Sequence, residues 1–172
     1  SLMTVPDVAK RLKALASRGK LVVIDPRRTE TAEVASEHHF IQPGSDAWFL
    51  LAFLQSLLKA GAPRIDRYAG KLAGLDEALS TVKAFDCSDV EARNGITLAN
   101  IERLANEFSA SGSAVAYGRM GVSTQAYGSL CQYLLQLINI VSGNLDREGS
   151  ALANEPAIPV TGPGTSPGQR GR

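Results

Sequence analysis

Leu21-Val22-Val23-Ile24 is an unbroken run of apolar, mostly β-branched residues, and it stops at Asp25-Pro26-Arg27. Such a run is typical of a strand that is buried on both faces within a parallel sheet. Proline ends the strand because it has no amide hydrogen to donate to a neighbouring strand. We therefore predict a buried strand over residues 21–24 with a turn at its carboxyl end.

Helices and further strands are predicted on both sides of this run. Apolar residues recur at helical spacing through Val8, Leu12 and Leu15, and a second short strand is expected over residues 38–42. The segment after Asp46 is apolar on almost every side, so we expect a helix covered by neighbours. Later elements are a helix over 98–108 capped by Thr97, a third strand over 114–117, and a helix over 126–142 with Tyr127 and Leu130 turned inward. This alternation predicts an α/β fold with a Rossmann-like, mainly parallel sheet and flanking helices.

Composition narrows the class of function. The 172 residues (18.2 kDa) carry 18 Lys and Arg against 17 Asp and Glu, a formal net charge of +1. No large field of one sign is available for nucleic acid. Cys87 and Cys131 stand far apart, so neither a disulfide scaffold nor a zinc or iron–sulfur motif is supported. The longest apolar run is too short to span a bilayer, and we expect a cytoplasmic protein without a membrane segment.

Three parts of the chain are expected. Residues 1–116 form a dinucleotide-binding-like α/β domain, and residues 117–155 begin an adjoining α/β domain. Residues 156–172 hold half of the prolines and several glycines, which predicts a flexible tail. The chain is therefore interpreted as part of a larger multidomain enzyme.

Polar or glycine-rich turns follow each of the three predicted strands: Asp25-Pro26-Arg27, Pro43-Gly44-Ser45-Asp46 and Gly118-Arg119-Met120-Gly121. Ligands of parallel sheets bind beyond the carboxyl ends of the strands. Each turn alone has a simpler explanation, as a plain turn, a helix entrance or a glycine pair. Together their carboxylates suit ribose hydroxyls or the N–H donors of guanine, while arginine and a helix start suit phosphate. A nucleotide-containing ligand fits this chemistry.

Motifs for independent catalysis are missing from the sequence. No Gly-x-Gly-x-x-Gly, P-loop or Gly-x-Ser-x-Gly pattern occurs. His38 and His39 are adjacent and point to opposite faces of a strand, with no third metal ligand nearby. We predict no catalytic residue and no metal ligand in this chain.

The same turns carry a family resemblance. The runs Lys20–Ala32, Ile41–Asp46, Tyr117–Gln125 and Gly143–Gly149 resemble, in order and spacing, the bis-molybdopterin guanine dinucleotide oxidoreductases. This family includes formate dehydrogenases, nitrate reductases and dimethyl sulfoxide reductase, and the details look nearest the first two. The resemblance covers nearly the whole chain to about Pro159 and implies an internal fragment of such an enzyme.

What the resemblance implies is a cradle for the molybdenum or tungsten cofactor, bis-molybdopterin guanine dinucleotide (bis-MGD). By carry-over, the nucleotide end of one pterin cofactor would be held by Asp25, Pro26, Arg27, Gly44 and Asp46, with Asp46 reading guanine. The second cofactor or its pterin would be approached by Gly118, Met120, Gly121 and Gln125. A 4Fe-4S cluster and the metal ligands would belong to other parts of the parent enzyme. The remaining domains of the parent are then the partners, and the fragment alone is expected to be inactive.

Two alternatives remain at this point. The chain could be a freestanding nucleotide-binding module that uses the same turns without a metal. It could also be a structural or interaction module whose turns bind no ligand.

Overall fold

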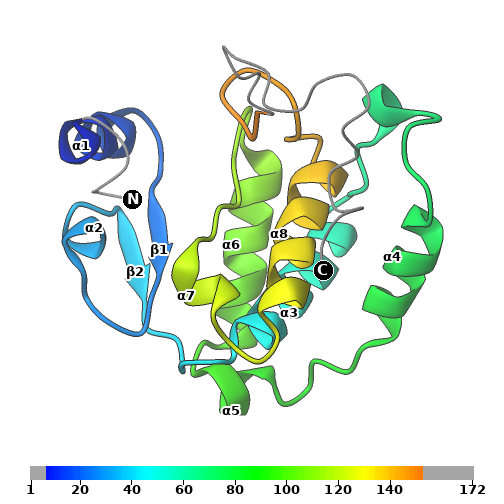
Figure 1. The fold of residues 1–172 in the computed structure, drawn as a ribbon, viewed down its shortest axis with the longest axis horizontal. Coiled ribbons are helices and arrows are strands. Elements are labelled where there is room, and N and C mark those ends of the chain that lie inside the picture. Colours follow the sequence, from blue (N-terminus) through cyan, green and yellow to red (C-terminus); the bar gives the residue numbers. More distant parts are fainter. Residues whose placement is uncertain (1–6, 153–172) are drawn as a thin grey trace, which may run out of the picture.

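The computed structural model describes residues 7–152. Its elements, in chain order, are α1 (Val8–Arg18), β1 (Val22–Ile24), α2 (Glu30–Glu33), β2 (Glu37–His39), α3 (Asp46–Lys59), the 3₁₀ helix η1 (Asp66–Tyr68), α4 (Leu75–Ala84), α5 (Val90–Asn94), α6 (Leu98–Ala110), α7 (Met120–Ser123) and α8 (Gly128–Val141). Figure 1 shows the two strands with α1 and α2 on one side of the molecule and the longer helices on the other. None of the helices in residues 7–152 has both the length and the apolar character needed to cross a membrane.

The sheet is parallel, as predicted, but small. β1 and β2 pair in parallel, with Val22 opposite Glu37 and Ile24 opposite His39. The α/β class is thus confirmed in its coarse form, whereas the described residues form only a two-stranded sheet beside many helices. The residues of β1 are half-buried instead of buried on both faces. The physical reason is that no third described strand flanks β1.

The predicted third strand at residues 114–117 is not formed, since these residues belong to no strand or sheet. Its backbone partners are side-chain amides of α8 and the loop after it. The amide of Ala116 donates to Asn139 Oδ1 (2.9 Å), and its carbonyl accepts from Asn139 Nδ2 (2.8 Å). The amide of Ala114 donates to Asn144 Oδ1 (3.2 Å). Two asparagines therefore replace the neighbouring strand along this edge.

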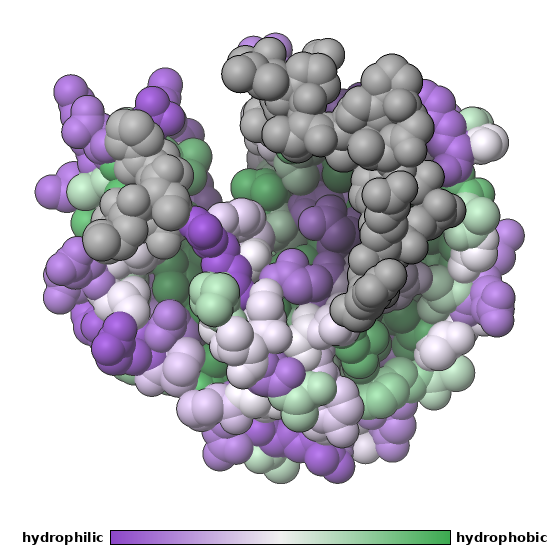
Figure 2. Space-filling view, in the orientation of Figure 1, coloured by the Kyte–Doolittle hydropathy of each residue, from purple (hydrophilic) through white to green (hydrophobic). Residues whose placement is uncertain are grey.

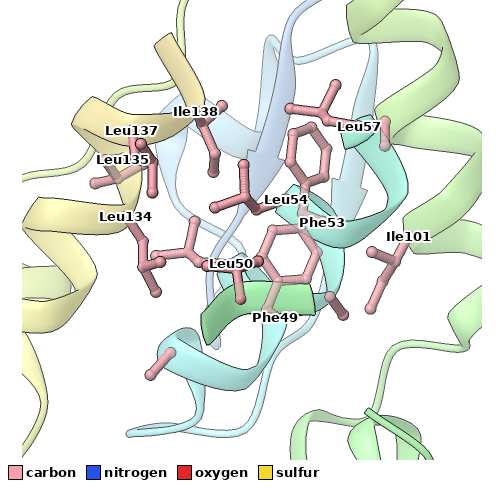
Figure 3. Close-up of a cluster of buried hydrophobic side chains, with 14 of the residues drawn as sticks. Phe49, Leu50, Phe53, Leu54, Leu57, Ile101, Leu134, Leu135, Leu137 and Ile138 are labelled. Atoms are coloured by element: carbon pink, nitrogen blue, oxygen red, sulfur yellow. The ribbon is translucent and has the colours of Figure 1, made fainter. Parts of the chain in front are cut away.

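The core forms around α3, the apolar helix that the sequence predicts to be covered. α3 packs against α6 and α8, and Leu54 and Leu57 are completely buried. Figure 3 shows the side chains of α3 lying between Ile101 of α6 and Leu134 of α8. The predicted cap of α6 is confirmed, since the Thr97 hydroxyl accepts a hydrogen bond from the amide of Asn100.

Helix α8 begins later than predicted, and two of its expected inward residues face solvent. Tyr127 precedes the first helical residue and is 48% exposed, and Leu130 is 40% exposed. Both predictions of burial were wrong because the inward stripe begins at Cys131 and continues through Leu134 and Ile138. α8 shares one hydrophobic cluster with α3, across the predicted boundary at residues 116 and 117. That boundary stays a prediction, and the predicted tail at 156–172 lies outside the described residues.

Candidate functional site

The turns singled out in the sequence gather at one end of the molecule. Because β1 and β2 are parallel, their carboxyl ends lie at the same edge of the sheet. Figure 1 shows that the start of α3 lies below the ends of the strands in that view and that the short helix α7 lies beside them. Asp25 directly follows β1, Asp46 is the first residue of α3, and Gly121 lies in α7. We call this end of the molecule the rim.

Asp46 and Gln125 are in direct contact at the rim, although 79 residues separate them. Gln125 Nε2 donates to Asp46 Oδ2 at 2.9 Å and to the carbonyl of Gly121 at 3.0 Å. Asp46 Oδ1 has no hydrogen bond to a described residue, and Gln125 Oε1 is buried with no partner among residues 7–152. A buried acceptor left unpaired costs about 1–3 kcal/mol. The pair therefore offers acceptor oxygens that suit a ligand with N–H donors.

The entry into α3 leaves backbone donors beside these acceptors. Gly44 has φ +83°, a left-handed conformation that turns the chain into the helix at little cost for glycine. The Ser45 hydroxyl donates to the carbonyl of Gln42 (2.6 Å) and caps no amide of α3. The amides of Asp46 and Ala47 accordingly donate to no described residue. Such free amides favour an anionic group at the helix start.

The turn after β1 is ordered by its own aspartate. Asp25 Oδ1 accepts from the amide of Arg27 (2.8 Å), and the carbonyl of Asp25 is 3.1 Å from His38 Nε2. Pro26 and Arg27 are exposed, and the Arg27 guanidinium has no ion pair with a described residue. No hydrogen bond in the described part of the chain joins Asp25 to Asp46. The structure thus places both at the rim without bringing them into contact.

The two glycines of the third turn differ in their surroundings. A Cβ on Gly118 would lie 2.6 Å from Leu135 Cδ1 and 2.9 Å from Val122 Cγ2, so a larger residue would require these side chains to shift. A Cβ on Gly121 would meet nothing within 4 Å, and the neighbouring Met120 is 68% exposed. Gly118 therefore has a structural explanation, while Gly121 and Met120 leave room for a ligand.

The sequence reasoning assigned to the core, or left out, several side chains that contact α3 or the turn before it. The rings of Trp48 and Tyr127 meet edge to face with centroids 5.4 Å apart, and the Arg93 guanidinium lies 5.2 Å from the centre of the Trp48 ring. Asn94 is completely buried, its carbonyl accepts from the amide of Gln42 (3.0 Å), and its Nδ2 has no partner. One sign in the sequence that Asn94 is buried is that this asparagine stands close to apolar residues.

Cys131 is completely buried in the hydrophobic core, as predicted. Burial first, and the negative charge of Asp46 second, raise the pKa of the Cys131 thiol to about 11. It therefore stays protonated at neutral pH, and it belongs to the hydrophobic cluster. Residues 7–152 contain no group of three or more His, Cys, Asp or Glu side chains that could hold a metal ion.

The strongest charge coupling lies at the other end of β2, away from the rim. Lys20, Glu37, Arg103 and Glu107 form a charged cluster in which Lys20 Nζ is 2.6 Å from Glu37 Oε2 and Arg103 Nη1 is 2.8 Å from Glu107 Oε1. Hydrogen bonds from Arg103, together with those from Lys20 and His39, lower the pKa of Glu37 to about 2. This cluster connects β2 to α6, which belongs to the helical core.

Known proteins resemble this chain over most of its length. No family model matches it. An assimilatory nitrate reductase from Haloferax mediterranei is 30% identical over 140 residues, which are 81% of this chain and 19% of that protein. Formate dehydrogenase H from Escherichia coli is 26% identical over 143 residues, 83% of this chain and 20% of that protein. The chain thus spans about a fifth of the length of these relatives.

A solved structure shows the same fold. Acetylene hydratase from Pelobacter acetylenicus matches with a TM-score of 0.73 at 22% identity, over 83% of this chain and 20% of that chain. The fold and the sequence matches are those of one segment of the molybdopterin oxidoreductases, the class that the motifs predicted. The chain is a homologue of the nitrate reductases and formate dehydrogenases of this family.

Proposed function

We propose that this chain forms part of the cradle that holds the guanine dinucleotide end of a molybdenum or tungsten pterin cofactor in a longer oxidoreductase. The observation that carries the proposal is the Asp46–Gln125 pair, with a buried Gln125 oxygen that accepts no hydrogen bond from a described residue. Guanine presents adjacent N–H donors, and a carboxylate accepts such donors in bidentate fashion. The donors and acceptors at the rim therefore fit the nucleotide that the family requires.

The residues of the rim take distinct roles in this proposal. Asp46 accepts the N–H groups of guanine, and Gln125 holds its carboxylate in place through Nε2. Gly44 and the first amides of α3 give a site for phosphate, and Arg27 adds a charge that no described carboxylate neutralises. Asp25 and Pro26 shape the adjoining turn. When bound, the metal–pterin group supplies the redox chemistry, which this chain does not perform by itself.

The finer features of the parent enzyme belong to the same proposal. A second cofactor or its pterin would approach Gly118, Met120, Gly121 and Gln125, and a 4Fe-4S cluster would lie on a segment outside this chain. The two strands would belong to a larger Rossmann-like sheet, and the other domains of the parent would be the partners. Nitrate or formate chemistry and a cytoplasmic location are the expectations for the whole protein.

Replacement of Asp46 in the full-length protein tests the proposal. In Asp46→Asn the carboxylate becomes an amide, so one acceptor oxygen is lost and a donor faces the guanine N–H groups. Hydrogen bonds to a charged group contribute about 1.5–3 kcal/mol, so the cofactor should bind about tenfold to 100-fold more weakly. The measurement is the GMP released by acid hydrolysis and the molybdenum or tungsten content, each per polypeptide, after dilution and gel filtration.

A matched control and the melting temperature separate binding from folding. Glu102→Gln on α6 makes the same chemical change at an exposed ion pair with Lys59 (3.5 Å) and should leave the GMP content unchanged. Asp46→Asn should lower the cofactor content per polypeptide clearly. The melting temperature of the cofactor-free protein should change little. Full cofactor content combined with a lowered melting temperature would show that Asp46 serves only the start of α3.

A further inference from the structure

A cavity at the end of the molecule opposite the rim is lined by three arginines. α6 and α8 both run away from the rim and end beside this cavity, at the top of Figure 1. The cavity has a volume of about 470 Å³, and its charged lining residues are Arg64, Asp66, Arg67 and Arg147. α8 has 14 residues, so its two ends are about 20 Å apart. The cofactor site proposed at the rim therefore does not account for this cavity.

Backbone carbonyls near the end of α6 hold two of the guanidinium groups in place. Arg64 donates to the carbonyl of Ser109 (Nη1, 3.0 Å) and to its hydroxyl (Nη2, 3.3 Å). Arg147 Nη2 donates to the carbonyl of Gly112 at 2.9 Å. Positive charge is favourable at the carboxyl end of a helix, which explains why these arginines are ordered there.

The third guanidinium group is held by a carbonyl and an aromatic ring. Arg67 Nη2 donates to the carbonyl of Asp146 at 2.6 Å, and its guanidinium lies 5.4 Å from the centre of the Tyr68 ring. Tyr68 is itself held, because its hydroxyl donates to the carbonyl of Leu145 at 2.6 Å. Side chains that are already ordered lose less conformational entropy when a ligand binds.

The three arginines keep their charge and most of their donors. None of them forms an ion pair with a described carboxylate. A guanidinium has five N–H groups, and the hydrogen bonds above use one in Arg67, one in Arg147 and two in Arg64. The amide of Gly112, which also lines the cavity, donates to no described residue. The cavity thus holds an excess of hydrogen-bond donors.

The charge balance of the lining specifies the charge of a ligand. Three positive charges against the one negative charge of Asp66 leave +2. Asp146 and Glu148 flank Arg147 in the sequence but do not line the cavity. A phosphate group carries about −1.5 to −2 at pH 7 and has three acceptor oxygens, which arginines bind in bidentate fashion. A carboxylate has a single negative charge and would leave the cavity positive.

The cations of α1 lack both the cavity and the fixed side chains. α1 contains Lys10, Arg11, Lys13 and Arg18 and no acidic residue, and Figure 2 shows hydrophilic residues gathered around this helix at the upper left. These side chains lie on the convex surface of one helix. Arg18 donates only to the carbonyl of Ala14 in the same helix. The arginines of the cavity, by contrast, come from separate segments and are ordered by contacts between them.

We propose that this cavity binds a phosphate group, with donors from Arg64, Arg67 and Arg147. A free phosphate ion and a small phosphate ester both present this group. The volume of about 470 Å³ leaves room for the organic part of an ester. The site lies at the opposite end of α8 from Gln125, so the inference goes beyond the proposed function and does not depend on it.

Isothermal titration calorimetry of the protein expressed from the complete open reading frame tests the proposal. The probe is inorganic phosphate at neutral pH and constant ionic strength. Arg67→Gln combined with Arg147→Gln should weaken phosphate binding at least about tenfold, because charge-assisted hydrogen bonds are lost. Arg11→Gln combined with Arg18→Gln on α1 removes the same charge and should leave the affinity within about twofold. Phosphate bound elsewhere in the longer protein is common to both double variants.

A gain of affinity separates binding from folding. Asp66→Asn removes the negative charge from the lining of the cavity, and the Asp66 side chain makes no hydrogen bond to a described residue. This variant should bind phosphate at least about twofold more tightly. Damage to the surrounding loops could not produce such a gain.

A ligand series identifies the source of the phosphate group and sets the results that would overturn the proposal. Tighter binding of glycerol 3-phosphate than of inorganic phosphate would identify an ester as the ligand, and equal or weaker binding would identify the free ion. Acetate binding as tightly as phosphate would show only a general attraction of anions and would overturn the proposal. Phosphate binding that the Arg67 and Arg147 substitutions leave unchanged, or no saturable binding, would overturn it as well. None of these results bears on the guanine assignment at Asp46.

Discussion

Asn139 should be the most costly polar residue of α8 to replace. It is 1% exposed, and its side-chain amide makes three hydrogen bonds. Two of these satisfy the amide and carbonyl of Ala116, and the third goes to the carbonyl of Leu135 at 3.0 Å. Asn139→Ala removes all three and leaves both backbone groups of Ala116 without a partner. The change in the free energy of unfolding then measures how much this side chain stabilises a segment that has no neighbouring strand.

The expected loss follows from the number of groups left unpaired. A hydrogen bond contributes about 0.5–1.5 kcal/mol net, so the two bonds to Ala116 and the third to Leu135 amount to about 1.5–4.5 kcal/mol. For a chain of this size that change lowers the melting temperature by about 3–18 °C. Urea denaturation followed by circular dichroism gives the free energy of unfolding, and the exchange rate of the Ala116 amide gives the local effect.

The matched control lies on the same helix. Gln136 is exposed on α8, so Gln136→Ala should change the free energy of unfolding by less than about 0.5 kcal/mol. The Ala116 amide should exchange faster in Asn139→Ala and at the original rate in Gln136→Ala. A loss below about 0.5 kcal/mol in Asn139→Ala, with the Ala116 amide still protected, would refute the idea that Asn139 holds this segment.

Further predictions concern the charged cluster and the turn after α7. The pKa of Glu37, lowered to about 2, means that this carboxylate stabilises the fold above pH 4.5 and that the contribution disappears as the pH falls towards 2. The shift sets an upper limit of about 3 kcal/mol, which the exposed partners reduce to about 1–2 kcal/mol, so Glu37→Gln should flatten acid unfolding curves between pH 5 and 2. Identical curves would contradict this. Gly128→Ala should destabilise by at least about 2 kcal/mol, because its Cβ would lie 2.0 Å from the carbonyl oxygen of Ser123, whereas Gly121→Ala has open space and should be near neutral in the same melting assay. Equal stability of these two glycine variants would show that the chain shifts freely at the start of α8.

The sequence predicted the parts of the fold that leave a local pattern. The apolar segment after Asp46 forms the central helix because no face of it is polar enough to meet solvent. Thr97 caps α6 because its hydroxyl reaches an amide three residues away. The ends of β1 and the start of α3 share one end of the molecule, since parallel strands leave a common carboxyl edge.

The parts that were missed depend on contacts without a sequence period. Residues 114–117 have a strand-like composition, but their partners are single amides of Asn139 and Asn144, and such residues leave no repeating signal. Tyr127 sits at a helical spacing from Leu134, yet the helix starts one residue later, so the ring lies at the surface beside Trp48. The Asp46–Gln125 contact joins residues 79 positions apart and has no local signature.

The residues of the rim contribute less to the hydrophobic core than the residues of α3 and α8 do, which fits a role of the rim in binding. Leu54 and Ile138 are completely buried, whereas Asp46 and Gln125 lie at the ends of elements and are only half-buried. The Gln125 oxygen has no hydrogen-bond partner among the described residues, which costs about 1–3 kcal/mol. A ligand that donates to this oxygen removes the cost, so binding at the rim gains free energy that the protein alone cannot gain. Polar groups unsatisfied within an otherwise well-packed fold are expected where function and stability compete.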